Sequence, residues 1–318
     1  MTTLLGVRDL AVDYLGTSGR VRAVDGVTFS LEKGSTLGIV GESGCGKSTL
    51  GFSILRIVPP PGRIVSGHID LDGVDLLQQP EEAMRRVRGS QVSMIFQDPM
   101  TSLDPLMRIR DHFLELFRTH ESTITKEDAV SRTTKMLDSL GIGADRIDDY
   151  PHQFSGGMRQ RVMIGLALAL EPKLIIADEP TTALDVIVES QVLELLKQLK
   201  QKYGLTLILI THNIGIVAEM ADTIAVMYAG QVVEVGPTVD IFENPLHPYT
   251  KGLLESAPNV LHPERSMRPI PGTPPDLLSP PSGCRFHPRC PKAFEPCPIR
   301  EPMLVARNNR LVSCHLYD

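Results

Sequence analysis

The sequence predicts an α/β fold with a parallel sheet, and two observations lead to this prediction. Over the first 236 residues, short apolar runs alternate with longer helical patterns. Each run is followed by Gly, Asp or another polar residue, which is typical of buried strands. The runs cover residues 36–40, 92–96, 173–177 and 206–210. Because buried strands that alternate with helices form parallel sheets, we expect helices on both faces of this sheet.

Three further segments complete the expected architecture. Residues 3–35 alternate as short strands and predict an antiparallel β edge subdomain. A stretch from about 98 to 160 has helical periodicity and no convincing strand, which indicates a helical insert. Residues 237–318 hold 16 of the 25 prolines, so they cannot be mostly long helix or central strand. We predict one domain over residues 1–240 and a Pro- and Cys-rich extension over 241–318.

Composition and charge exclude several classes of protein. Of the 318 residues, 42% are hydrophobic and 22% are charged, close to a globular average. The net charge of −6 argues against a general nucleic-acid binder. No apolar run reaches the ~18 residues of a membrane span, and the N-terminus lacks the features of a signal peptide, so we expect a cytosolic chain. Five cysteines are too few for a disulfide scaffold.

A phosphate-loop pattern, G-x-x-x-x-G-K-[S/T], covers residues 41–49, between a predicted strand and a predicted helix. Glycines allow backbone amides to approach phosphate oxygens, and the helix N-terminus adds about half a positive charge. Lys47 is expected to neutralise the β- and γ-phosphates, and Ser48 to ligate Mg²⁺. The pattern predicts a P-loop NTPase core of the RecA-like type. The expected nucleotide contacts are Gly41, Ser43, Gly44, Cys45, Gly46, Lys47, Ser48 and Thr49.

Two carboxylates end the predicted strand at 173–177. Asp178 and Glu179 follow its apolar run, at the edge where ligands bind in open α/β sheets. Asp178 is expected to orient Mg²⁺ through its water shell. Glu179 lies one residue further and points differently, so we expect it to polarise an attacking water. Beside the phosphate loop, the pair predicts nucleotide hydrolysis rather than a plain helix cap.

One motif narrows the class further: the string FSGGMRQR at residues 154–161, followed by an apolar helix. Here the sequence resembles the ATP-binding-cassette (ABC) ATPases, whose signature is S-G-G-x-x-[Q/R]. The resemblance covers residues 3–240 almost without gaps. Other markers stand at the expected spacing, namely Gln97, the run 183–185 and His212. The resemblance implies a hydrolytic ATPase that uses ATP and Mg²⁺.

The resemblance also implies a surface shared with a second cassette. Ser155, Gly156 and Gly157 form a capped helix N-terminus with bare amides, which suits a phosphate group. In the family this step completes the site of a partner subunit, so that two cassettes sandwich two ATP molecules head to tail. Asp185 is expected at the same seam, with an ordinary helix cap as the alternative.

Three single residues match the family by position. Tyr14 resembles the aromatic residue that stacks on adenine. Gln97 resembles the glutamine that contacts Mg²⁺ and the water, and His212 resembles the switch histidine that bonds the γ-phosphate. Two departures are visible, since many relatives have Asp where Asn213 stands and Ser where Cys45 stands. Neither removes a catalytic group, so we expect a competent site. The expected catalytic residues are Glu179, His212 and Gln97.

Three longer strings resemble one branch of the family, the oligopeptide and dipeptide importers. They are QDPMTSLDP at 97–105, HPYTKGLL at 247–254 and GCRFHPRCP at 283–291. The resemblance implies an ATPase subunit that drives peptide uptake from the cytoplasmic face of the cell membrane, as a peripheral protein. Expected partners are a second ATPase chain in a heterodimer, two transmembrane permease subunits and an extracytoplasmic solute-binding protein. Nickel or another small solute is an alternative cargo. A less favoured alternative function is that of a soluble ABC ATPase without a transport role.

Four cysteines in the extension predict a metal site, because disulfides are disfavoured in the cytosol. They are Cys284, Cys290, Cys297 and Cys314. Their spacing matches neither ordinary zinc modules nor a ferredoxin run. Family resemblance favours a [4Fe–4S] cluster, with Zn²⁺ or reduced thiols as alternatives and His287 or His315 as alternative ligands. We expect a structural role, since a metal supplies folding energy to a segment with little core; regulation by iron or redox state is the alternative.

Overall fold

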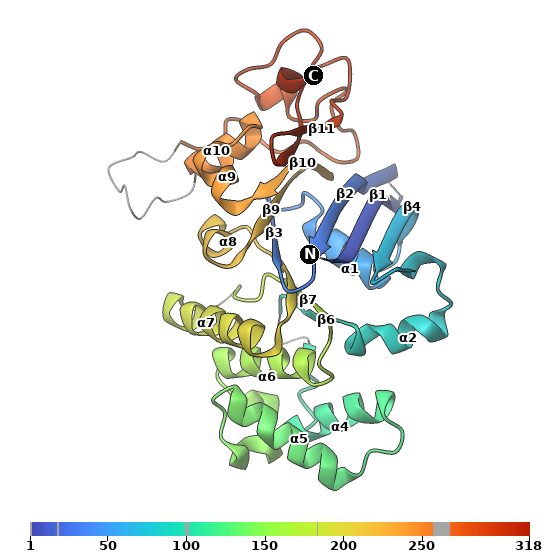
Figure 1. Ribbon diagram of the computed structural model, residues 1–318, viewed down its shortest axis with the longest axis vertical. Coiled ribbons are helices and arrows are strands. Elements are labelled where there is room, and N and C mark those ends of the chain that lie inside the picture. The colour runs from blue at the N-terminus through green and yellow to red at the C-terminus, as the bar shows by residue number, and fades with distance from the viewer. Residues whose placement is uncertain (1, 18, 99–101, 183, 257–267) are drawn as a thin grey trace. The chain divides into compact units, whose positions relative to one another are not determined.

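The structure is a computed structural model, and it describes residues 2–17, 19–98, 102–182, 184–256 and 268–318. The chain divides into two compact units (Figure 1). Unit 1 comprises Met1–Gln79 and Leu209–Asp318, and unit 2 comprises Pro80–Ile208. Residues 99–101 of the string 97–105, and residue 183 of the family marker 183–185, lie outside the described residues.

Unit 1 contains an antiparallel sheet with strand order β2-β1-β4-β5. Its strands are β1 (Thr3–Gly16), β2 (Gly19–Glu32), β4 (Gly62–Leu71) and β5 (Val74–Asp75). Figure 1 shows the first three of them side by side, in the blue part of the chain. Inward-facing side chains such as Leu5 and Leu10 are fully buried, and each stabilises the fold by about 1.5–3 kcal/mol. The predicted antiparallel edge is confirmed.

Unit 1 also contains a mixed set of strands around β3 (Thr36–Val40), all five residues of which are buried. β3 pairs in parallel with β9, which pairs antiparallel with β10; β12 then joins β10 and β11. These strands are β9 (Thr223–Tyr228), β10 (Gln231–Pro237), β11 (Leu304–Arg307) and β12 (Arg310–Ser313). The helices of the unit are α1 (Lys47–Ile54), α8 (Ile214–Met220), α9 (Thr238–Glu243) and α10 (Pro248–Ser256), with 3-10 turns at Leu76–Gln78, His287–Arg289 and His315–Tyr317.

Unit 2 is built on two parallel strands and a group of helices. The strands are β6 (Val92–Ile95) and β7 (Leu174–Asp178), which pair in parallel. The helices are α2 (Glu81–Ser90), α4 (Ile109–His120), α5 (Lys126–Ser139), α6 (Gly156–Leu168) and α7 (Val186–Tyr203), with 3-10 turns at Ala144–Asp148 and Pro151–Gln153. The chain returns to unit 1 within β8 (Thr206–Ile210). All four predicted buried strands are therefore present.

The helical insert predicted from about 98 to 160 contains no strand in its described residues. Its helix α4 buries Ile109, Phe113 and Phe117, which recur every four residues on one face. Figure 1 shows α4 and α5 beside α6. A Cβ on Gly165 of α6 would lie 2.6 Å from Leu140 Cδ1, so this glycine allows close packing of the helices. Among the described helices, none combines the length and apolarity needed to cross a bilayer.

Candidate functional site

The phosphate loop joins β3 to α1 in unit 1. Gly46, which precedes α1, has a φ of 103°, a conformation that residues with a side chain rarely adopt. A Cβ on Gly46 would lie 2.0 Å from the carbonyl oxygen of Ala23, and one on Gly41 would lie 2.2 Å from that of Met227. The loop backbone is therefore packed against its neighbours, and only glycine fits at these two positions.

Lys47 is buried and closes the loop. Its Nζ donates hydrogen bonds to the carbonyl oxygens of Gly41 at 2.8 Å and Glu42 at 3.0 Å. Tyr14 lies beside the start of α1, with its hydroxyl 3.4 Å from Thr49 Oγ1. The loop thus combines a lysine with the amide-bearing end of a helix, a combination that suits a phosphate group. The other predicted contacts of this loop and helix are Ser43, Gly44, Cys45 and Ser48.

In unit 2 the acidic end of β7 is held by two hydrogen-bond donors. Gln97 Nε2 donates to Glu179 Oε2 at 3.1 Å, and Thr182 Oγ1 donates to the same oxygen at 2.9 Å. Glu179 has a φ of 44°, in the left-handed region that costs an L-residue about 1–2 kcal/mol. Asp178, the last residue of β7, is 2% exposed. The structure therefore brings Gln97 and Glu179 together and fixes the orientation of the Glu179 carboxylate.

The predicted signature and seam residues cap two helices of unit 2. Ser155 Oγ accepts a hydrogen bond from the backbone N–H of Met158 at 3.3 Å, at the start of α6. Asp185 Oδ1 accepts from two backbone amides at the start of α7, at 3.0 and 3.1 Å. A Cβ on Gly157 would lie 2.4 Å from Val188 Cγ1. The two helix starts therefore pack closely, and the glycine is needed for that packing.

His212 follows β8 and is exposed in unit 1. The next residue, Asn213, caps α8, since its Oδ1 accepts from the N–H of Gly215 at 3.0 Å. The predicted nucleotide residues thus belong to both units. Unit 1 holds Tyr14, Gly41, Ser43, Gly44, Cys45, Gly46, Lys47, Ser48, Thr49 and His212. Unit 2 holds Gln97, Ser155, Gly156, Gly157, Asp178, Glu179 and Asp185.

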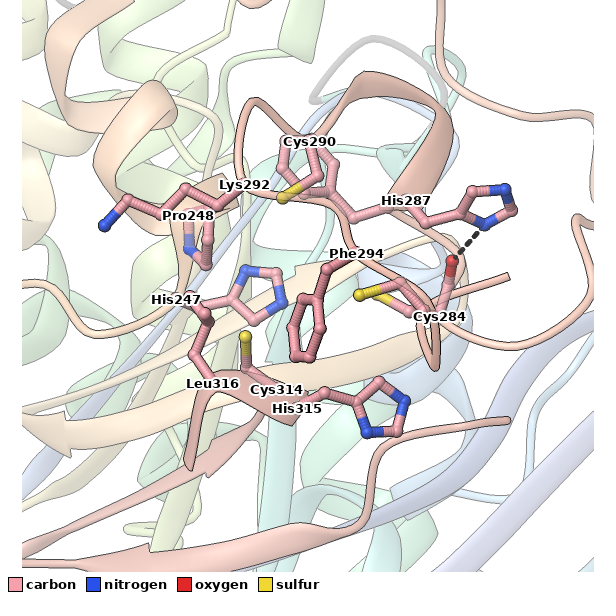
Figure 2. Close-up of a pocket in the computed structure, with 12 residues that line it drawn as sticks. His247, Pro248, Cys284, His287, Cys290, Lys292, Phe294, Cys314, His315 and Leu316 are labelled. Carbon is pink, nitrogen blue, oxygen red and sulfur yellow. Dashed lines mark hydrogen bonds between the residues drawn. The ribbon is translucent and has the colours of Figure 1, made fainter. Parts of the chain in front are cut away.

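Four cysteines of the extension line one small pocket in unit 1 (Figure 2). They are Cys284, Cys290, Cys297 and Cys314. Burial raises the pKa of the Cys284 and Cys290 thiols, and it raises the pKa of Cys314 to about 11. These three thiols are therefore protonated near neutral pH, whereas a metal binds thiolates.

The side-chain positions do not by themselves support the predicted metal site. In the described part of the chain, no three His, Cys, Asp or Glu side chains form a group that would hold a metal ion. The two alternative histidines are engaged elsewhere. His315 contacts Asp318 Oδ2 through Nδ1 at 2.5 Å and the Arg300 carbonyl through Nε2 at 2.7 Å. His287 contacts the Cys284 carbonyl, and Figure 2 shows its ring turned away from the cysteines.

Three residues of the extension were not predicted as functional. His247 lines the cysteine pocket, and burial lowers its pKa to about 3, so the ring is neutral. Tyr249 Oη accepts a hydrogen bond from the N–H of Glu42 at 2.9 Å. Arg289 pairs with the side chain of Glu42 at 2.7 Å. The sequence marks all three only by family likeness. Neither periodicity nor spacing links Tyr249 and Arg289 to a loop more than 200 residues away.

Comparison with known proteins assigns the family. A family model described as "ABC transporter" matches residues 24–182, and one described as "Oligopeptide/dipeptide transporter, C-terminal region" matches residues 233–297. The dipeptide transport ATP-binding protein DppD of Bacillus subtilis is 46% identical, covering 100% of this chain and 96% of the relative. The oligopeptide transport ATP-binding protein OppD of Escherichia coli is 45% identical, covering 98% and 92%.

Solved structures agree with this assignment. The ATP-binding cassette MJ0796, in a dimeric post-hydrolysis state bound to ADP and Pi, has a TM-score of 0.65 at 25% identity, covering 74% of this chain and 99% of that one. CbiO1 from Clostridium perfringens has a TM-score of 0.64 at 28% identity, covering 77% and 92%. The chain belongs to the ABC transporter family, with a P-loop NTPase fold, and is an ABC-type ATPase.

Proposed function

We propose that this chain is the ATP-hydrolysing subunit of an ABC importer for dipeptides and oligopeptides. The observation that carries the proposal is its likeness, over nearly the whole chain, to relatives whose names state dipeptide or oligopeptide transport. The match of residues 233–297 to a peptide-transporter region supports it, because that region lies beyond the general cassette match. We accordingly propose a nucleotide-binding domain over residues 1–240 and a branch-specific extension over 241–318.

In this proposal unit 1 supplies the groups that bind the base and phosphates of the nucleotide, and Gln97 and Asp178 of unit 2 act through Mg²⁺. Lys47 and the loop amides neutralise the β- and γ-phosphates, and the closed loop geometry around Gly41 and Glu42 supports this role. Tyr14 stacks on adenine, and His212 bonds the γ-phosphate. Mg²⁺, when bound with ATP, would be held by Ser48, Gln97 and Asp178 and would neutralise phosphate charge.

Unit 2 supplies the general base. Glu179 accepts a proton from the attacking water, a contribution of about 10²–10⁴ in rate. The hydrogen bonds from Gln97 and Thr182 support this role, because they hold one carboxylate oxygen in place. A base fixed before the reaction loses little entropy in reaching the water.

The signature helix serves a second cassette in this proposal. Ser155, Gly156 and Gly157 contact the ATP bound by a partner subunit, and Asp185 lies at the seam. The dimeric state of the similar cassette MJ0796 supports such pairing. We propose a related ATPase chain as the partner, with two permease subunits and a solute-binding protein, and a peripheral position on the cytoplasmic face of the cell membrane.

We further propose that the cysteine pocket holds a [4Fe–4S] cluster. The four cysteines lie around one small pocket, and four cysteine thiolates are the usual ligand set of such a cluster. The cluster would crosslink a proline-rich segment. Anaerobic purification, followed by measurement of iron, sulfide and zinc, tests this: four irons and sulfides per chain are expected, whereas zinc or metal-free thiols would overturn it.

The transport proposal is tested by its partners. The tagged chain is extracted gently from its own membranes without oxygen, and co-purifying proteins are identified by mass spectrometry. Two multi-span subunits, a second cassette chain and a solute-binding protein carrying peptide are expected. Recovery of a binding protein loaded with nickel would mean that nickel, and not peptide, is the transported solute. Recovery of the chain alone, or with ribosomal or DNA-bound proteins, would overturn the transport role and leave the ATPase in place.

A further inference from the structure

Arg289 is buried against the phosphate loop, with 6% of its side chain exposed. Its terminal nitrogens donate to the two carboxylate oxygens of Glu42 at 2.7 and 3.0 Å. Its Nε donates to the carbonyl of Pro271 at 2.9 Å, and Tyr228 Oη accepts at 3.3 Å. Because a bidentate pair has a fixed geometry, Arg289 determines where the Glu42 side chain lies.

Glu42 is the second residue of the phosphate loop, and three of its groups are held. Its carbonyl oxygen accepts from Lys47 Nζ at 3.0 Å, and its N–H donates to Tyr249 Oη at 2.9 Å. Arg289 holds its side chain. Two residues of the extension therefore position the carbonyl group that receives the phosphate-binding lysine.

The segment that carries Arg289 also carries two cysteines of the pocket. Arg289 ends the 3-10 turn His287–Arg289, which lies between Cys284 and Cys290. Phe286, in the same segment, lines the pocket, and its ring centroid lies 5.2 Å from that of Tyr228. A ligand bound by both cysteines would fix the two ends of this turn.

A second arginine makes a parallel connection. Arg285, next to Cys284, donates a hydrogen bond to the carbonyl of Ala229. The N–H of the following residue, Gly230, donates to the carbonyl of Cys45 at 2.9 Å. Cys45 belongs to the phosphate loop. Arg289 contacts this loop directly, and Arg285 is connected to it through Ala229 and Gly230.

We propose that Arg289 is a positioning residue of the phosphate loop, and that it couples this loop to the cysteine pocket so that a pocket ligand and ATP bind with positive coupling. The coupling rests on the proposed metal ligand, whereas the positioning rests on geometry alone. A ligand held by Cys284 and Cys290 would fix the turn that carries Arg289, and Arg289 holds Glu42. By thermodynamic reciprocity, bound nucleotide then also retains the pocket ligand.

The positioning is tested on the full chain, purified without oxygen, with a fluorescent ATP analogue and Mg²⁺ as the probe. Arg289→Met is expected to weaken analogue binding about tenfold. Glu42→Gln is expected to weaken it too, and the double variant is expected to lose no more than Arg289→Met alone. Arg289→Lys keeps the charge but not the fork, so it restores binding only in part. Arg300→Ala, at an exposed arginine of the same extension, is the control and is expected to bind as the parent chain does.

Unchanged affinity in both Arg289→Met and Glu42→Gln would overturn the positioning role. If Arg289→Met does not fold, Glu42→Gln alone tests the positioning role, because it removes the carboxylate partner of the Arg289–Glu42 ion pair. Additive losses in the double variant would also overturn it, since the two residues would then act separately.

The coupling is tested by removing the pocket ligand with an iron chelator and measuring analogue affinity again. The parent chain is expected to lose affinity about fivefold, and Arg289→Met is expected to change little. Equal losses in the two proteins, or none in the parent after confirmed metal loss, would overturn the coupling. A chain that contains no metal as purified would overturn the proposed cluster and the coupling together, while the Glu42 and Arg289 variants still decide the positioning.

Discussion

The phosphate loop and the helix starts at Ser155 and Asp185 are held in opposite ways. Glu42 of the loop is bound by residues 247 and 207 positions away in the chain. The caps at Ser155 and Asp185 bind amides only two or three residues away. The difference teaches that one of the two proposed phosphate-binding elements depends on tertiary structure, whereas the caps of the other are encoded locally. Damage to the extension should therefore reach the phosphate loop and spare the signature helix.

The largest effect is expected at Glu179, where loss of the proposed general base should act on chemistry and leave the phosphate loop and the signature helix intact. Glu179→Gln should lower the rate of phosphate release by about 10²–10⁴, because the amide cannot accept the proton from water. ATP should remain bound, as measured by filter retention. Glu194→Gln, an exposed exchange on α7, is the control. Turnover equal to that of the parent chain would exclude Glu179 as the general base.

Glu234 of β10 sharpens the contrast, because it holds the first residues of the extension. This fully buried carboxylate accepts from the N–H groups of Leu246 and His247, both at 2.9 Å, just before Tyr249. Glu234→Ala should lower the free energy of unfolding of the chain by about 3–5 kcal/mol, because two backbone N–H groups lose their acceptor and the buried cation of Arg310 loses its carboxylate partner.

The same Glu234→Ala exchange should also weaken binding of a fluorescent ATP analogue. Glu82→Ala, at an exposed ion pair, should cost about 0–1 kcal/mol in a urea titration. Equal urea midpoints for the two variants would contradict the predicted stability cost, and unchanged analogue binding in Glu234→Ala would mean that Glu234 does not support the loop.

Alanine substitutions at two glycines with positive φ distinguish backbone strain from steric overlap of an added Cβ. Gly46 lies in the phosphate loop, whereas Gly204 ends α7, where an added Cβ would meet no other atom within 4 Å. Alanine at either position costs about 1–2 kcal/mol for its backbone conformation. Gly46→Ala adds the 2.0 Å overlap with Ala23, so its melting temperature should fall further, and it alone should lose ATP. Equal losses would show that the loop tolerates the extra carbon.

The smallest effect is expected at the signature cap. Ser155→Ala removes one local bond to the N–H of Met158 and should cost about 1 kcal/mol. Ser190→Ala, at an exposed helix position, should be near neutral in the same urea titration. Binding of the ATP analogue to the isolated chain should not change in Ser155→Ala, since this helix serves a second cassette in the proposal. A loss of that binding would place Ser155 at the chain's own nucleotide.

Strands and site residues were predictable from the sequence where the pattern that marks them is local or strongly apolar. The buried strands were predictable because their residues are almost all apolar, as in β3 and β8. The glycines and Lys47 were predictable because any phosphate loop needs bare amides and a cation. Gln97 and Glu179 were each predictable as site residues. The hydrogen bond between them was not, since 82 positions separate them in the chain.

The sequence by itself determined the strands, the phosphate loop, the two local caps and the family, because each depends on neighbouring residues or on a short motif. Only the tertiary structure decided that Arg289 and Tyr249 hold Glu42, and that His247 shares the pocket of the four cysteines. The physical reason is that a buried ion pair or pocket forms between segments whose separation in the chain carries no periodic signal. Their meeting depends on how β9, β10 and the extension pack within unit 1.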